Sequence, residues 1–153
     1  MTRRGATLIE AVVVIVILAL SVPAAVAMLS QSAETRVEAV KIARATLLAE
    51  GVLEHVLADV ASDEIGFAAL DDAGYYMGDP ESGLRTRIES FARSYTDLGL
   101  SYELDISPLV ASDGVETGDP SLDLFRRVEV TVRAPSSTGS PIVLRIETMV
   151  GDL

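Results

Sequence analysis

The sequence predicts an α+β protein, in which one long N-terminal α-helix packs against a C-terminal antiparallel sheet of three to four strands. Two observations indicate this fold class. An apolar run near the start continues into an amphipathic helical pattern that reaches about residue 61. The last third alternates apolar and polar residues with the two-residue period of strands that bury one face. Such a sheet needs a covering layer, which the apolar stripe of the helix can supply.

The first element is an apolar segment. Residues 6–28 contain a single charged side chain, Glu10. A helix needs about 20 residues to cross the hydrocarbon core of a bilayer, so residues 6–29 are long enough to span a membrane. Arg3 and Arg4 precede the segment, and the positive-inside rule therefore places the N-terminus in the cytoplasm and the remaining chain on the outer side.

A cleaved secretory signal peptide is the alternative interpretation of this segment. The basic start, the apolar core and the small residues of Ala25-Val26-Ala27 match part of that pattern. The acidic Glu10 at the front of the apolar core and the very short basic stub argue against it. We therefore expect the segment to anchor the protein.

The second half of the helix is amphipathic. Residues 30–61 contain no proline and one glycine, and apolar side chains at three- and four-residue steps predict one buried stripe. The stripe consists of Val37, Val40, Ala43, Leu47, Leu48, Val52, Val56 and Val60. One helix from about Ala6 to about Ala61 would be roughly 80 Å long. Pro23 should kink or locally melt it, because proline removes a ladder hydrogen bond and clashes with the preceding turn.

Residues 62–153 are expected to form a globular head. Glycine and proline interrupt residues 62–99, so we expect a connecting region there, with a short helix at 84–95. Three stretches then have the strand period: 102–106, 127–133 and 142–149. Loops over 111–121 and 134–141 join them as an antiparallel meander.

Composition excludes several functions. The net charge of −11 argues against binding nucleic acid, whose phosphates attract basic residues. The chain has no cysteine and one histidine, His55, which we expect at the boundary of the helix stripe rather than as a ligand. No carboxylate pair is tied by its spacing to a cleft. We therefore expect neither an enzyme nor a cofactor.

Two weaker features have ordinary structural interpretations. The carboxylates of Asp113, Glu116, Asp119 and Asp123 lie on one glycine-containing loop, and oxygen ligands of this kind could hold Ca²⁺. Their spacing is not that of an EF-hand, and a solvated acidic turn without metal is the favoured interpretation. The run Tyr75-Tyr76-Met77 is interpreted as an anchor in the core or a loop, with a partner-facing patch as the alternative.

The N-terminus resembles the type IV pilin superfamily, which includes the pilins and the type II secretion pseudopilins. The matching residues are Gly5-Ala6-Thr7-Leu8-Ile9-Glu10 and the apolar helix that follows. In this family a short basic leader ends in glycine, a phenylalanine usually follows, and here Ala6 takes its place. The resemblance implies the lollipop fold of pilins, with the same order of long helix and antiparallel sheet.

The resemblance assigns roles to three residues. Residues 1–5 would be a leader that a membrane-embedded prepilin peptidase removes between Gly5 and Ala6. The new amino group of Ala6 would be N-methylated, and Glu10 would become the fifth residue of the mature chain and take part in assembly. A carboxylate in hydrocarbon costs on the order of 2–3 kcal/mol on insertion scales, so it needs a cation. The ammonium group of Ala6, from the same chain or a neighbour, is such a cation; the alternative is that Glu10 stays hydrated at headgroup depth.

The segments Ala43–Glu54 and Phe125–Val132 are similar to those of I-type minor pseudopilins and PilV-like minor pilins. Major pilins of one branch have a C-terminal cysteine pair, which this chain lacks. The resemblance thus favours a minor, tip-type subunit of a type II secretion pseudopilus or type IV pilus, used in protein secretion.

The implied partners are other pilin subunits, the prepilin peptidase and the assembly platform of the bacterial inner membrane. The chain would cross that membrane once, with its head in the periplasm or outside the cell, and enter an envelope filament after assembly. The alternative is a membrane-anchored binding domain that does not polymerise.

Overall fold

The structure is a computed structural model that describes residues 8–136 and 139–152. The chain divides into two compact units, one up to Ala39 and one from Val40 onward. Helix α1 (Leu8–Val60) contributes residues to both units. The division falls inside the predicted amphipathic segment 30–61.

The first unit consists of the apolar part of α1. Among the described residues, α1 is the one helix that is long and apolar enough to cross a membrane. Its most apolar window has a mean hydropathy of 2.9, and none of that window is buried. The prediction of a long apolar N-terminal helix is therefore confirmed.

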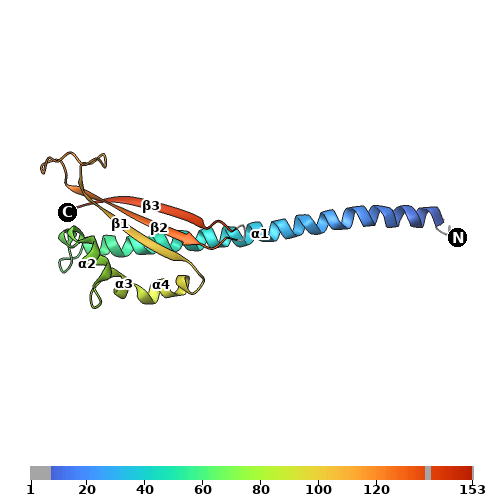
Figure 1. Cartoon of the computed structure of the whole chain (residues 1–153), viewed down its shortest axis with the longest axis horizontal. Coiled ribbons are helices and arrows are strands. Elements are labelled where there is room, and N and C mark those ends of the chain that lie inside the picture. Colours follow the sequence, from blue (N-terminus) through green and yellow to red (C-terminus); the bar gives the residue numbers. More distant parts are fainter. Residues whose placement is uncertain (1–7, 137–138, 153) are drawn as a thin grey trace, which may run out of the picture. The chain divides into compact units, whose positions relative to one another are not determined.

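The second unit is the head, in which three strands follow a series of short helices (Figure 1). The helices are η1 (Phe67–Asp71), α2 (Ala73–Gly78), α3 (Leu84–Arg87) and α4 (Glu89–Thr96). The strands are β1 (Ser101–Val110), β2 (Phe125–Ala134) and β3 (Ile142–Gly151). They form one antiparallel sheet in the order β1-β2-β3. The predicted α+β fold and meander are confirmed, with three strands among the described residues.

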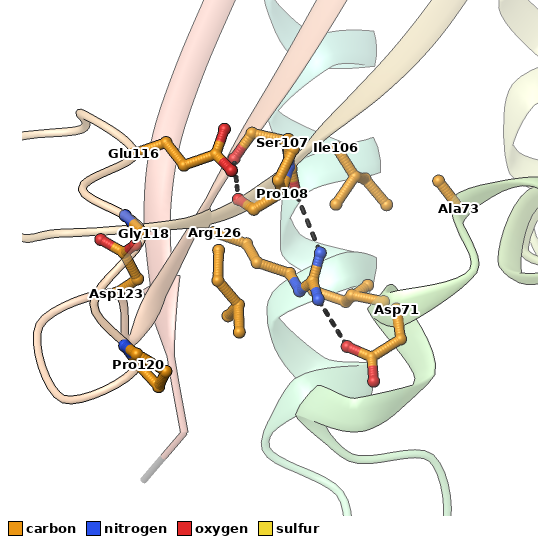
Figure 2. A pocket seen from close by; sticks show the side chains of 12 residues that line it. Asp71, Ala73, Ile106, Ser107, Pro108, Glu116, Gly118, Pro120, Asp123 and Arg126 are labelled. Atoms are coloured by element: carbon orange, nitrogen blue, oxygen red, sulfur yellow. Dashed lines mark hydrogen bonds and ion pairs between the residues drawn. The ribbon is translucent and has the colours of Figure 1, made fainter.

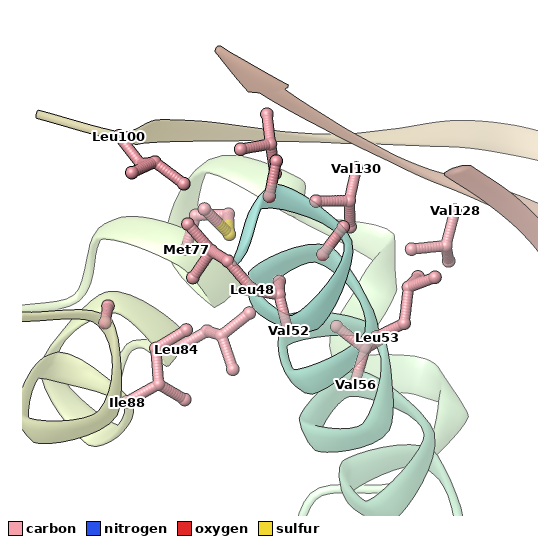
Figure 3. Close-up of a cluster of buried hydrophobic side chains, with 14 of the residues drawn as sticks. Leu48, Val52, Leu53, Val56, Met77, Leu84, Ile88, Leu100, Val128 and Val130 are labelled. Atoms are coloured by element: carbon pink, nitrogen blue, oxygen red, sulfur yellow. The ribbon is translucent and has the colours of Figure 1, made fainter. Parts of the chain in front are cut away.

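The core of the head lies between the sheet, the second half of α1 and the short helices (Figure 3). From α1, Leu48, Val52 and Val56 are completely buried. The inner face of β2 contributes Val128, Val130 and Val132. Leu84 of α3 and Ile88, the residue directly after α3, complete the cluster. Burying each such side chain stabilises the fold by roughly 1.5–3 kcal/mol, so this cluster fixes the sheet on the helix.

The predicted stripe of α1 is wrong in its first half. Val37, Val40 and Leu47 are 56%, 49% and 54% exposed, and Ala43 is exposed as well. Leu48, Val52 and Val56 of the predicted stripe are buried, which confirms its second half. The whole buried face of α1 consists of Ala45, Leu48, Ala49, Val52, Leu53, Val56 and Asp59. Two alanines begin this face, where a small side chain lets the neighbouring elements approach the helix. Hydropathy alone gives alanine little weight, so the pattern favoured the larger valines and leucine on the other side.

Residues 62–99 are more helical than the sequence predicted. The expected helix over 84–95 is present as α3 and α4, which are separated at Ile88, where φ is −96° and ψ is 7°. Helix α2 begins at an N-cap, Asp72, whose Oδ1 accepts a hydrogen bond from the Tyr75 N–H at 2.9 Å. Helices of four to eight residues are too short to show a clear apolar period, and tertiary packing stabilises them instead.

A glycine near the C-terminal end of α1 lets α4 pack closely. A Cβ atom at Gly51 would overlap the ring of Phe91, which also contacts the rings of His55 and Tyr95. Glycine inside a helix costs about 1 kcal/mol relative to alanine. Here that cost is offset by the aromatic side chain that occupies the space of the missing Cβ.

Candidate functional site

Glu10 is the acidic residue in the first turn of α1 as described. It is exposed, and so are the neighbouring Leu8 and Ile9, which are 83% and 75% exposed. A carboxylate near a helix N-terminus interacts favourably with the helix dipole. The position therefore combines a carboxylate with a wide apolar surface that needs a lipid or protein environment.

The predicted cleavage and methylation positions, Gly5 and Ala6, lie outside the described residues. The structure consequently leaves the predicted leader 1–5 and the amine of Ala6 as predictions from the sequence.

Pro23 lies inside α1, and the helix continues on both sides of it. Local melting at Pro23 is therefore not observed, and a bend there stays a prediction. Proline has no N–H to donate to the carbonyl of Ala19, so one ladder bond is missing. Two residues earlier the hydroxyl of Ser21 donates to the Ile17 carbonyl at 2.8 Å, a local bond that often accompanies helix bending.

The acidic loop between β1 and β2 does not gather its carboxylates into a metal site. Asp123 accepts hydrogen bonds from the Thr117 N–H and hydroxyl and from the Gly118 N–H, at 2.8–3.1 Å. Asp119 accepts from Ser121 and Asp113 from the Val115 N–H. In the described part of the chain, which includes these residues and Glu116, no three acidic or histidine side chains are placed to hold a metal ion. The loop is thus an internally hydrogen-bonded turn.

Partial burial of Asp123 raises its pKa, but the hydrogen bonds from Thr117 and Gly118 outweigh this effect. The net pKa of Asp123 is therefore lower than usual. The same hydrogen bonds join Thr117 and Gly118 to Asp123 within the loop.

A cavity of about 600 Å³ opens where β1 leaves its regular register between Ile106 and Leu109 (Figure 2). Arg126, which is 8% exposed, lies at its wall and donates to the Ser107 carbonyl at 3.0 Å and to Asp71 at 2.5 Å. Its Nε is buried without a hydrogen-bond partner among the described residues. The guanidinium charge is matched by Asp71, and histidine and cysteine do not line the cavity. We assign no reaction to this cavity.

A second charged group links the end of α1 to α2 and α3. Asp59 is 7% exposed, and its carboxylate accepts two hydrogen bonds from Arg87, at 2.5 and 2.6 Å. The hydroxyl of Tyr76 donates to the same carboxylate at 2.5 Å. This group is not predicted from the sequence. The only indication was an acidic residue three positions after Val56, on the apolar side of the helix.

His55 and the run Tyr75-Tyr76-Met77 are the two remaining candidates from the sequence. His55 is exposed on α1, and its ring centroid lies 5.8 Å from that of Phe91. In the tyrosine run, Tyr76 and Met77 are buried, whereas Tyr75 is 63% exposed. The anchoring interpretation therefore holds for Tyr76 and Met77.

Comparison with known proteins finds no match. No family model matches the chain, and neither a curated protein nor a solved structure matches it. We therefore infer the function from the residues themselves and from the resemblance of the N-terminal segment.

The Tyr76 hydroxyl gives the head a pH dependence. Burial and, to a smaller extent, the adjacent Asp59 raise the pKa of Tyr76 above its ordinary value of 10.0. An acid whose pKa is raised in the folded state contributes stability below the unfolded pKa and loses it as pH rises above that value.

We expect the free energy of unfolding of the head to fall above about pH 10, and this fall to be smaller in Tyr76→Phe. Burial also raises the pKa of Tyr102, against the effect of Arg85, so part of the fall should remain in the variant. Urea unfolding of the full chain in detergent, followed by the methyl NMR signals of Val128 and Val130, measures both curves. Parallel curves for the two proteins would show that Tyr76 does not titrate in this way.

Proposed function

We propose that this protein is a structural subunit of a type II secretion pseudopilus or a type IV pilus, processed by a prepilin peptidase and assembled through its N-terminal helix. Within that class we assign it to the minor, tip-type subunits. The head then supplies the contacts that distinguish this subunit from others in the filament.

The observation that carries the proposal is the position of Glu10. It is a single carboxylate at the start of an apolar helix whose described side chains are exposed from Leu8 to Leu29. A helix exposed in this way needs lipid or other helices around it, and a cation stabilises a carboxylate at membrane depth. A neighbouring subunit of the same kind supplies both, since its helix is apolar and its processed N-terminus is an ammonium group.

The fold is compatible with this function. Helix α1 is continuous from Leu8 to Val60, and its second half forms one layer of the head core. A subunit built in this way can place its apolar half in the membrane before assembly and among other helices afterwards.

Fractionation of a native host tests the proposal. The full chain with an epitope tag at its C-terminus should be found in filaments sheared from the cell surface, or in the pseudopilus formed when the system is overproduced. That fraction should disappear when the assembly ATPase is deleted, while the membrane pool remains. A chain that stays wholly in the inner membrane in both strains would instead be an anchored binding domain that does not polymerise.

A further inference from the structure

The two edges of the sheet differ in their protection. At the β1 edge the register breaks between Ile106 and Leu109, and the break contains Pro108, which has no N–H to offer a further strand. Helix α2 also packs against β1. At the other edge, β3 pairs with β2 in unbroken register from Ile142 to Gly151 and contains no proline. Bulges and prolines protect edges against pairing, so β3 is the edge open to another strand.

The sequence of β3 is complementary to itself. If two β3 strands pair antiparallel with Ile146 opposite Ile146, Arg145 of each lies opposite Glu147 of the other. Val143 then lies opposite Met149, on the same face as the charges. Opposite charges and apolar pairs at facing positions both stabilise antiparallel strands. We propose that two copies of this chain pair through their β3 edges in this register, with a two-fold axis at Ile146.

Within one chain, Glu147 faces another carboxylate across the sheet. Its direct neighbour in the sheet is Glu129, and the cation beside it, Arg145, already pairs with Glu129 at 3.1 Å. Arg127 and Asp113 line a small cavity with Glu147, and no ion pair of Glu147 is present among the described residues. In the paired form, Arg145 of the second copy faces Glu147 directly.

The apolar residues on the same face are also exposed. Val143 is 53% exposed and Met149 is 38% exposed. In the paired form they cover each other at both ends of the charged centre. A self-complementary patch of this kind produces a closed, two-fold dimer rather than an open chain of subunits.

The direction of the strands separates this contact from filament assembly. A two-fold axis perpendicular to the sheet reverses the direction of every element that runs parallel to the sheet, including the part of α1 that packs on it. The contact therefore pairs heads whose sheet-packed α1 segments run in opposite directions, so it does not join successive subunits that point the same way. It goes beyond the proposed function and does not depend on it.

Charge reversal tests the register. Arg145→Glu and Glu147→Arg each turn both symmetry-related pairs into like-charge pairs. Each should raise the dimer dissociation constant about tenfold or more. The double variant Arg145→Glu/Glu147→Arg restores opposite charges and should restore the affinity. Sedimentation equilibrium of the full chain in density-matched detergent measures all four proteins. A wild type that stays monomeric at every concentration, or a dimer that neither single reversal weakens, would overturn the proposal.

Because the chain has no cysteine, cross-linking offers an independent measurement. A mixture of Val143→Cys and Met149→Cys chains should form a mixed disulfide dimer under mild oxidation, and Val143→Cys alone should not. Arg133→Glu, on the neighbouring strand, is the matched charge control and should dimerise like the wild type. The proposal fails if the mixed disulfide is absent, or if Val143→Cys alone cross-links equally well. This result decides the question even if the double variant Arg145→Glu/Glu147→Arg does not fold.

Discussion

Glu10→Ala is expected to lower incorporation of the protein into filaments at least tenfold while membrane insertion and leader removal continue. Alanine makes the helix more apolar, so insertion does not suffer. The loss falls on assembly, because the ammonium group of a neighbouring subunit then has no carboxylate to pair with in a medium of low dielectric constant. The amount of tagged chain in sheared filaments, divided by the amount in the membrane, measures the effect.

Glu34→Ala is the matched control, since Glu34 is an exposed acidic residue of α1 that lies beyond the apolar segment. It should assemble like the wild type. Glu10→Asp keeps the charge on a shorter side chain and should assemble better than Glu10→Ala. If Glu10→Ala is incorporated normally, Glu10 is a hydrated residue at headgroup depth and does not pair with the amine of a neighbouring subunit.

Asp59→Ala is expected to lower the free energy of unfolding of the head by about 2–4 kcal/mol. The carboxylate accepts hydrogen bonds from both Arg87 nitrogens and from the Tyr76 hydroxyl, and its side chain is 10% exposed. Removing one member of a buried pair usually costs about 3–5 kcal/mol, because the other charge is left without compensation. The expected loss is smaller here because the Arg87 side chain is 30% exposed and can reach water.

Urea unfolding of the full chain in detergent measures this loss. The four tyrosines, Tyr75, Tyr76, Tyr95 and Tyr102, all lie in the head and tryptophan is absent, so tyrosine fluorescence reports the head alone. Glu89→Ala is the control, because the Glu89–Arg93 pair is exposed on both sides and should contribute less than about 1 kcal/mol. Equal losses for the two variants would mean that the Asp59 group does not hold the short helices on α1.

Local patterns were sufficient to predict the elements that extend far enough to show their period. The apolar half of α1 and the three strands were found because each repeats one period over many residues, as in the alternation of Val128, Val130 and Val132. Glu10 was found because a charge in an apolar run is conspicuous in sequence.

Features that depend on packing between distant segments could not be predicted. Which side of α1 is buried depends on where the sheet and α3 approach it, and Ala45 and Ala49 mark that side without a strong hydropathy signal. The Asp59 group brings together residues 17 and 28 positions apart in the sequence. The break at Ser107 and Pro108, which exposes the cavity beside Arg126, appears only once the register of β1 with β2 is known.

Mass spectrometry of the N-terminus of the protein isolated from its native membrane tests directly whether the chain is processed as a prepilin. We expect a mature chain that begins at Ala6, with a methyl group on its amine, and a chain that keeps Gly5 when the prepilin peptidase is deleted. An intact Met1 in the wild-type strain, or a chain that begins after Ala27, would contradict this expectation.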